Sequence, residues 1–299
     1  MGDFFNNNGT VALQQDIIKE QCNFSDETRL HLGENILSFL DHALPSKCTG
    51  NLCGKIHEKG KSISWNIDYE PEERQSSPKP VTLLPEKYYT MSFPKAKVLV
   101  TAPNLLFSGV VTVNGEKFDI DKWIGSENHN WGEKHTDCYA WGQVCGFDNL
   151  PDTFLECSTA QIKLGPFMSP KMSLAVLRVG DGEYRFSGIC QALKNSGNYS
   201  FTDEFSPEMF QWDMTCQIDN LKLTIKMSCQ KADVAGLVYR NPPGGSHTCL
   251  NSKVARCELL LTSAGEVVHH LVSSHGAAFE ILTDRQDHGI EIQNSPAEL

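Results

Sequence analysis

Strand-like runs joined by very short turns are the feature that most constrains the fold of this chain. Asn114-Gly115 and Asp219-Asn220 are two-residue turns flanked by apolar or alternating runs, a strong local signal of a β-hairpin. The paired runs are residues 107–113 and 117–120, 174–179 and 183–186, 210–218 and 221–229, and 254–262 and 266–271. Consecutive hairpins favour an antiparallel barrel or sandwich, so we expect an all-β fold.

The first part of the chain is less regular. Residues 11–19, 28–32, 36–40 and 62–69 are predicted to be short strands, and the polar residues 70–80, with three prolines, are predicted to be a linker. We therefore expect an incomplete β module over residues 1–79 and a β-barrel domain over residues 80–285. The polar residues 286–299 are expected to be a disordered tail.

Composition and charge exclude several classes of function. The formal net charge of −11, with no run of Lys or Arg, argues against nucleic acid or an anionic membrane surface as the main partner. No apolar run approaches the roughly 20 residues of a membrane helix, and residues 1–10 contain no signal-peptide core. We therefore expect a cytoplasmic protein with no integral membrane segment. Because no Gly-rich phosphate loop follows a strand, no cofactor is expected.

The cysteines do not form a recognisable metal or disulfide framework. There are 11 of them, and none belongs to a Cys-x-x-Cys pair, so a zinc site is not expected. Several lie in strand-like runs, where a free cysteine behaves as a small buried hydrophobic residue. Cys48 and Cys53 are close enough in sequence to form a disulfide bond if the protein is exported.

Residues 139–147 are predicted to form a strand with two very different faces. One face carries small residues, and the other carries Tyr139, Trp141, Gln143, Cys145 and Phe147. A strand of this kind suits a barrel that lines a cavity with its bulky face. The amide of Gln143 is informative, because a polar group on an otherwise apolar face needs a hydrogen-bond partner.

Candidate acids lie close to this strand. Glu127 and His129 precede it in a predicted loop, and Glu156 lies in the strand predicted over residues 154–164. A carboxyl group in a dry pocket, or a histidine tuned by a neighbour, can donate a proton. His129 could equally bond to backbone groups and fix the loop, Glu156 could face water, and Asn130, Trp131 and Gly132 could close one end of a barrel.

His135 and Asp137 are two residues apart and would share one face of a strand. Either they hydrogen-bond, so that the carboxylate orients the histidine, or they form a solvated ion pair. A metal held by His129, His135 and Asp137 is not expected, because their spacing fits no standard site.

Several motifs, in order, resemble the tocopherol cyclase-like family, within a broader group of carotenoid hydratases and AttH-like proteins. The resemblance covers roughly residues 80–271, and the motifs that carry it are residues 109–116 (GVVTVNGE), 123–132 (WIGSENHNWG), 139–143 (YAWGQ) and 233–239 (DVAGLVY). It implies two lipocalin-like β-barrels or sandwiches, an apolar ligand cavity and proton donation to a prenyl-type double bond. The first module is shorter than in that family, and the loop before Asn130 is one residue longer.

Two classes of function follow from these observations. The first is a cofactor-independent cyclase, hydratase or isomerase acting on a hydrophobic small molecule, either prenylated or not. Its proton donor would be Glu127, His129 or Glu156, and its ligand-binding residues Asn130, Trp131, His135, Asp137, Tyr139, Trp141, Gln143 and Phe147. The second is a non-catalytic carrier of an apolar ligand, and a structural or interaction module is a further alternative. The sequence does not determine the oligomeric state.

Overall fold

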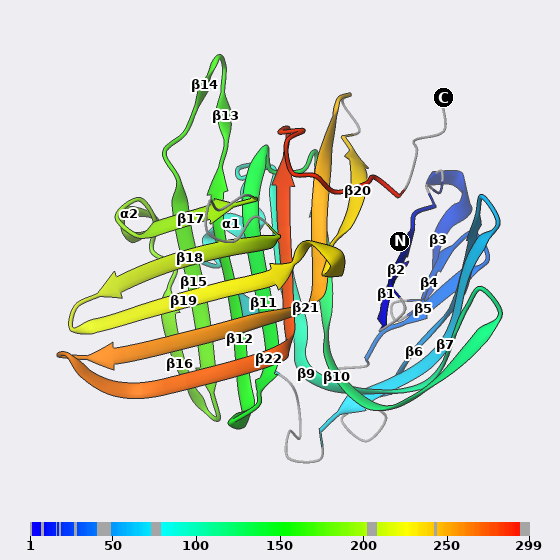
Figure 1. The fold of residues 1–299 in the computed structure, drawn as a ribbon, viewed down its shortest axis with the longest axis horizontal. Coiled ribbons are helices and arrows are strands. Elements are labelled where there is room, and N and C mark those ends of the chain that lie inside the picture. Colours follow the sequence, from blue (N-terminus) through cyan, green and yellow to red (C-terminus); the bar gives the residue numbers. More distant parts are fainter. Residues whose placement is uncertain are drawn as a thin grey trace.

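The computed structural model describes residues 2–6, 9–15, 17, 19–26, 29–40, 49–72, 79–201, 208–241 and 244–293. In these residues the fold is all-β and lipocalin-like, as predicted, and it is built mainly from two curved antiparallel sheets (Figure 1). The helices are short: α1 (Lys87–Thr90), α2 (Ile189–Ala192) and the 3-10 turns η1 (Lys19–Gln21) and η3 (Lys231–Asp233). No described helix has the length and apolar character needed to cross a bilayer.

The first sheet has the strand order β10-β9-β7-β6-β5-β4-β3, with β8 beside β9. Alternation along β7 places Ile63, Trp65, Ile67 and Tyr69 on one face. Glycines on β6 leave room for two of these rings: a Cβ at Gly54 would lie 2.6 Å from Trp65. The strands are β3 (Cys22–Asp26), β4 (Arg29–Leu32), β5 (Asn35–Ser38), β6 (Gly50–Glu58), β7 (Lys61–Pro71), β8 (Val81–Thr82), β9 (Ala96–Val113) and β10 (Glu116–Gly132).

The second sheet has the order β16-β15-β12-β11-β22-β21-β19-β18-β17, with β20 beside β21. It curls round a core that includes Trp212, Phe210, Phe279 and Leu177, all buried. The four predicted hairpins are confirmed, with turns at the expected residues. The strands are β11 (Cys138–Phe147), β12 (Leu150–Gln161), β15 (Met172–Val179), β16 (Gly182–Phe186), β17 (Ser196–Ser200), β18 (Met209–Ile218), β19 (Leu221–Gln230), β20 (Ala235–Arg240), β21 (Ser246–Ser263) and β22 (Glu266–Thr283); β13 (Lys163–Leu164) and β14 (Phe167–Met168) pair separately.

The long strands β9 and β10 belong to the first sheet and also pack on the second (Figure 1). β9 pairs with β7 from Leu105 onward and with β8 at Leu99 and Val100, so it changes partner near Asn104, whose φ is +52°. Val100 packs against Phe154 of β12. Along the chain, β10 is the last strand of the first sheet, and β11 is the first strand of the second sheet. The division into folding units expected at residues 79 and 80 stays a prediction, because sheets and folding units need not coincide.

The hairpin of β1 (Gly2–Asn6) and β2 (Gly9–Leu13) lies between the two sheets. Phe4 and Leu13 pack on the first sheet, whereas Phe5 and Ala12 pack on strands of the second. The sequence placed a strand over residues 11–19, but β2 ends at Leu13. Successive side chains of this hairpin point to opposite sides, so the hairpin contributes apolar surface to both sheets.

The last described residues return to the same hairpin. The Ala12 amide donates to Gln293 Oε1 at 2.9 Å, and the Gln293 amide donates to the Gly236 carbonyl at 2.8 Å. His288 is buried. These residues fall in the segment expected to be a disordered tail; residues 294–299 lie outside the described part of the chain. Cys53 is a free thiol, and Cys48 also lies outside the described residues.

Candidate functional site

The two faces of β11 have opposite surroundings. Its small residues, Ala140, Gly142 and Val144, face the core of the second sheet, where a Cβ at Gly142 would lie 2.4 Å from Met227 Sδ. Tyr139, Trp141 and Gln143 face the other way. Gln143 contacts β10 of the first sheet, and Tyr139 packs with Phe5 and Ala12 of the β1–β2 hairpin. The bulky face of β11 therefore forms a wall between the two sheets.

Glu156 lies on the same wall, on β12. It is 0% exposed, and the Trp141 indole Nε1 donates a hydrogen bond to its Oε1 at 3.2 Å. Its Oε2 is buried and has no hydrogen-bond partner among the described residues. Burial raises the pKa of Glu156 from 4.5 to about 7, and the Trp141 hydrogen bond opposes this rise only in part. Glu156 is thus a buried carboxyl group that is about half protonated at neutral pH.

A network of amides joins β11 to β10. The Gln143 side chain exchanges two hydrogen bonds with Asn128, at 3.3 and 3.4 Å, and accepts a third from Ser126 Oγ at 2.7 Å. Cys145 follows on the same face, and burial raises the pKa of its thiol to about 11. The oxygen and the nitrogen of the Gln143 amide therefore both have hydrogen-bond partners on the first sheet.

The sequence did not single out Glu280, although it lies on the same wall. It is opposite Trp141 in the pairing of β11 with β22, and the Tyr139 hydroxyl donates a short hydrogen bond to its Oε1. Burial and the nearby Glu280 hold the pKa of Tyr139 well above its usual value. The sequence feature that could have pointed to Glu280 is its place as the single acid in the apolar run of residues 277–282.

Glu127 lies apart from this wall and faces the first sheet. Its Oε2 accepts a hydrogen bond from the Tyr69 hydroxyl at 2.5 Å, and its Oε1 accepts one from Thr101 Oγ1 at 2.5 Å. Register shifts on both sides of Glu127 distort β10 there. Glu127 and Glu156, the two candidate carboxyl donors, are therefore held in different hydrogen-bond networks.

The predicted loop around His129 is wrong: residues 128–132 form the end of β10. His129 pairs with Leu99 and Asn130 with Val98 on β9, and both side chains are exposed. The ring of Trp131 stacks on His129, with centroids 5.1 Å apart, and also lies near Tyr89 of α1. A strand forms here because the first half of β9 supplies backbone partners far away in the sequence.

Among the described residues, no hydrogen bond joins His135 to Asp137. Asp137 accepts from Lys134 Nζ at 2.6 Å and from the Lys163 amide at 2.9 Å. Burial opposes its ionisation, but these hydrogen bonds outweigh burial and lower its pKa. The ring of His135 packs near Tyr239, at 5.0 Å between centroids, and burial lowers the pKa of His135.

Phe147 is not on the wall. Gly146 has a φ of +77°, and the pairing with β12 shifts between Cys145 and Phe147. This bulge turns Phe147 into the core of the second sheet, where it is 2% exposed. The strict alternation expected for residues 139–147 therefore fails at its last residue.

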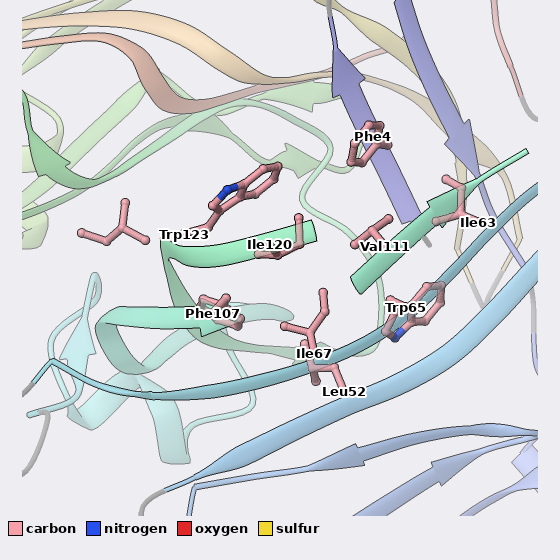
Figure 2. A pocket seen from close by; sticks show the side chains of 10 residues that line it. Phe4, Leu52, Ile63, Trp65, Ile67, Phe107, Val111, Ile120 and Trp123 are labelled. Atoms are coloured by element: carbon pink, nitrogen blue, oxygen red, sulfur yellow. The ribbon is translucent and has the colours of Figure 1, made fainter. Parts of the chain in front are cut away.

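An apolar groove of about 420 Å³ lies on the concave face of the first sheet (Figure 2). Trp65 and Ile67 project into it from β7, and Phe4 of the β1–β2 hairpin borders it. Phe107 lines the groove and stacks on Tyr69, which places the Tyr69–Glu127 pair next to one end. The other lining residues are Leu52, Ile63, Val111, Ile120, Trp123 and Ile124.

The comparisons with known proteins bear on the fold. No protein-family model and no curated protein sequence matches this chain. Kievitone hydratase from Nectria haematococca is similar in structure, with a TM-score of 0.50 and 12% sequence identity over 86% of this chain and 71% of that one. A protein assigned as AttH from Nitrosomonas europaea has a TM-score of 0.45 and 12% identity over 86% of this chain and 70% of that one. The chain thus has a fold similar to that of kievitone hydratase.

Proposed function

We propose that the protein binds a hydrophobic small molecule and adds water, or a hydroxyl group of the same molecule, to one of its alkenes. Glu156 is the proton donor, and no cofactor takes part. The observation that carries this proposal is the fully buried Glu156 carboxyl, whose Oε2 has no partner in the described part of the chain and whose pKa is raised to about 7. With that pKa, roughly half of the molecules carry the proton at neutral pH.

The neighbours of Glu156 suit this chemistry. Proton transfer from Glu156 to one alkene carbon leaves a carbocation at the other, and an aromatic face stabilises such a charge. The Trp141 ring lies next to Glu156, which places an aromatic side chain beside the proton donor. Attack by water on the carbocation, with loss of one proton of that water, then completes a hydratase reaction, and loss of a different proton from carbon gives an isomerase reaction.

Access to Glu156 requires a movement. Glu156 has no exposed surface, whereas Trp141 in front of it is half-buried. We propose that substrate enters between the sheets at Trp141, Tyr139 and Gln143. His129 and Asn130 are exposed on β10 and take no part in proton donation in this proposal. The similarity in fold to a protein named as a hydratase supports the assignment, as does the sequence resemblance to the tocopherol cyclase-like family.

A non-catalytic carrier is the second candidate, and the groove on the first sheet favours it. Its lining is apolar, and its volume of about 420 Å³ falls in the range of small-molecule sites. None of the candidate acids belongs to that lining. A prenyl or other hydrocarbon chain bound there would be solubilised and would not react.

The test is an assay in ¹⁸O-labelled water with a panel of prenylated phenols and acyclic isoprenoids. Wild type is expected to form product, with one labelled oxygen if water adds and none if a hydroxyl group of the substrate adds, and Glu156→Gln is expected to lose at least about 100-fold in rate, the usual effect of removing a general acid. Glu116→Gln, an exposed acid on β10, is the matched control and keeps the wild-type rate. Ligand binding is measured in a separate experiment, by the quenching of tryptophan fluorescence, because Trp65 and Trp123 line the groove.

Three outcomes distinguish the candidates. Turnover that depends on Glu156 supports the hydratase or cyclase. Binding without turnover overturns the enzyme and supports the carrier. Absence of binding to every compound in the panel overturns both candidates.

A further inference from the structure

The Trp141 indole lies between two carboxyl groups on neighbouring strands. On one side, Glu156 of β12 accepts its Nε1 hydrogen bond at 3.2 Å. On the other side, Glu280 of β22 is directly opposite Trp141 in the antiparallel register. All three side chains project from the same face of the sheet, because residues 139, 141 and 143 pair with residues 282, 280 and 278 and with 160, 158 and 156.

The two carboxyl groups differ in their surroundings. Glu156 is wholly buried, and its Oε2 has no partner among the described residues, whereas Glu280 is half-buried and accepts a hydrogen bond from the Tyr139 hydroxyl. A phenol that keeps its proton acts as a donor, and a donor stabilises the charged, accepting form of a carboxyl group. Tyr139 therefore holds the Glu280 carboxyl group in place by a hydrogen bond, while the apolar surroundings of Glu156 favour the neutral acid. Unequal surroundings of this kind separate an acid from a base.

We infer that Glu280 is the general base that activates the attacking water, with Tyr139 as the residue that positions it, and that Trp141 is the floor on which the cation forms between the two groups. This inference rests on the proposed hydratase function. Neighbouring strands are roughly 4.8 Å apart, so β12 and β22 are roughly 10 Å apart across β11. A separation of roughly 6.5–9.5 Å between two carboxyl groups already leaves room for substrate and water in inverting glycosidases.

The step balances in atoms and charge. Glu156 gives its proton to one alkene carbon and becomes a carboxylate, and the alkene π electrons form the new C–H bond. The water oxygen bonds to the resulting carbocation while Glu280 takes one of the water protons and becomes neutral. Exchange with solvent then returns a proton to Glu156 and removes one from Glu280, so that nothing is consumed except alkene and water.

This arrangement defines a substrate class. A carboxylic acid is a weak proton donor toward an alkene, so the cation formed must be a stable, tertiary one. The substrate therefore has a trisubstituted or 1,1-disubstituted double bond, as isoprenoids do, and places its branched carbon over Trp141 and toward β22. A disubstituted internal alkene, as in an unsaturated fatty acyl chain, would form a secondary cation and would not react.

The test separates proton donation from water attack by following two reactions in D₂O. With Glu280→Gln, formation of the alcohol should fall at least about 100-fold. Exchange of deuterium into the recovered alkene should stay within about threefold of wild type, because Glu156 can give and take back a proton without Glu280. Glu156→Gln should lose both reactions. Glu266→Gln, an exposed acid at the start of β22, is the matched control and should change neither.

The remaining outcomes each support or contradict the inference. If folded Glu280→Gln hydrates the alkene at the wild-type rate, or loses both reactions equally, Glu280 is not the base, and the role of Glu156 stands. If wild type performs neither reaction, the proposed function itself fails. If Glu280→Gln does not fold, Glu280→Asp replaces it: selective loss of hydration supports the inference, and equal loss of both reactions contradicts it.

Discussion

Burial sets the chemistry of Glu156. This residue pairs with Gln143 on β11, whose amide already has three hydrogen bonds to Ser126 and Asn128. The only hydrogen bond to the Glu156 carboxyl that the described residues provide comes from Trp141. A carboxylate in that position would lack the donors and cations that normally stabilise it, so the neutral form is favoured.

This raised pKa predicts how stability depends on pH. Between pH 4.5 and about 7 the unfolded chain releases the Glu156 proton while the folded chain keeps it, so the folded state loses stability as pH rises, by about 3 kcal/mol in all. Glu156→Gln should remove this loss. In urea unfolding across this range, the free energy of unfolding of the variant should therefore rise relative to wild type.

Glu116→Gln serves as the control for this comparison, because Glu116 is exposed. Its curve should run parallel to that of wild type. Parallel curves for Glu156→Gln as well would show that Glu156 titrates alike in the folded and unfolded chains.

Among the strands, β11 determines where the candidate site lies, because it pairs with both β12 and β22. The sequence predicted its two faces correctly as far as Cys145, because alternation is a local property that a strand must obey. Phe147 departed from the pattern because of the bulge at Gly146, which depends on the pairing with β12. The end of β10 was predicted to be a loop, since His129, Asn130 and Trp131 show no apolar alternation and their partners on β9 lie about 30 residues earlier in the chain.

Glu280 illustrates the same limit for the site. An acid inside the apolar run of residues 277–282 could be recognised, but its position opposite Trp141 follows from the pairing of strands more than 130 residues apart. Tyr69 and Thr101 could not be linked to Glu127 for the same reason. Local pattern and turn chemistry therefore predict strands and hairpins, and non-local register determines which polar groups meet.

Close packing behind β11 gives a second prediction. A methyl group at Gly142 would lie 2.4 Å from Met227 Sδ and 3.1 Å from the Trp212 ring. Gly142→Ala should therefore lower the free energy of unfolding by about 1–3 kcal/mol, because both side chains must shift inside a filled core. Chemical unfolding measures this loss.

Gly182→Ala provides the comparison, because a Cβ there would come no closer than 3.3 Å to any neighbour. Its cost should be below about 1 kcal/mol. Equal costs for the two substitutions would show that the core around Met227 is loosely packed.

On the scale of the whole molecule, the β1–β2 hairpin and the β9–β10 hairpin join the two sheets. The first supplies Phe4 and Leu13 to one sheet and Ala12 to the other, and the second carries Ser126 and Asn128 to Gln143. The wall that holds Glu156 is therefore a property of both sheets together, and a change in the hairpin should reach it.

Leu13→Ala tests the packing of the β1–β2 hairpin between the sheets. Leu13 is 3% exposed, so removing its side chain should destabilise the protein by about 2–5 kcal/mol. Phe24→Ala, at a residue that is 64% exposed, should cost less than about 0.5 kcal/mol. Denaturant unfolding of both variants measures the difference. A loss no larger for Leu13→Ala than for Phe24→Ala would contradict the packing of the hairpin between the sheets.

Titration of Glu156 in the intact chain tests most directly whether this residue can be the proton donor. Protein labelled with ¹³C at the glutamate side-chain carboxyl carbon is titrated by NMR, and the Glu156 signal is assigned as the one missing in Glu156→Gln. We expect a midpoint near pH 7, above the usual 4.5 of a glutamate. A midpoint at or below 4.5 would contradict it, because Glu156 would then be ionised at neutral pH and could not be the proton donor.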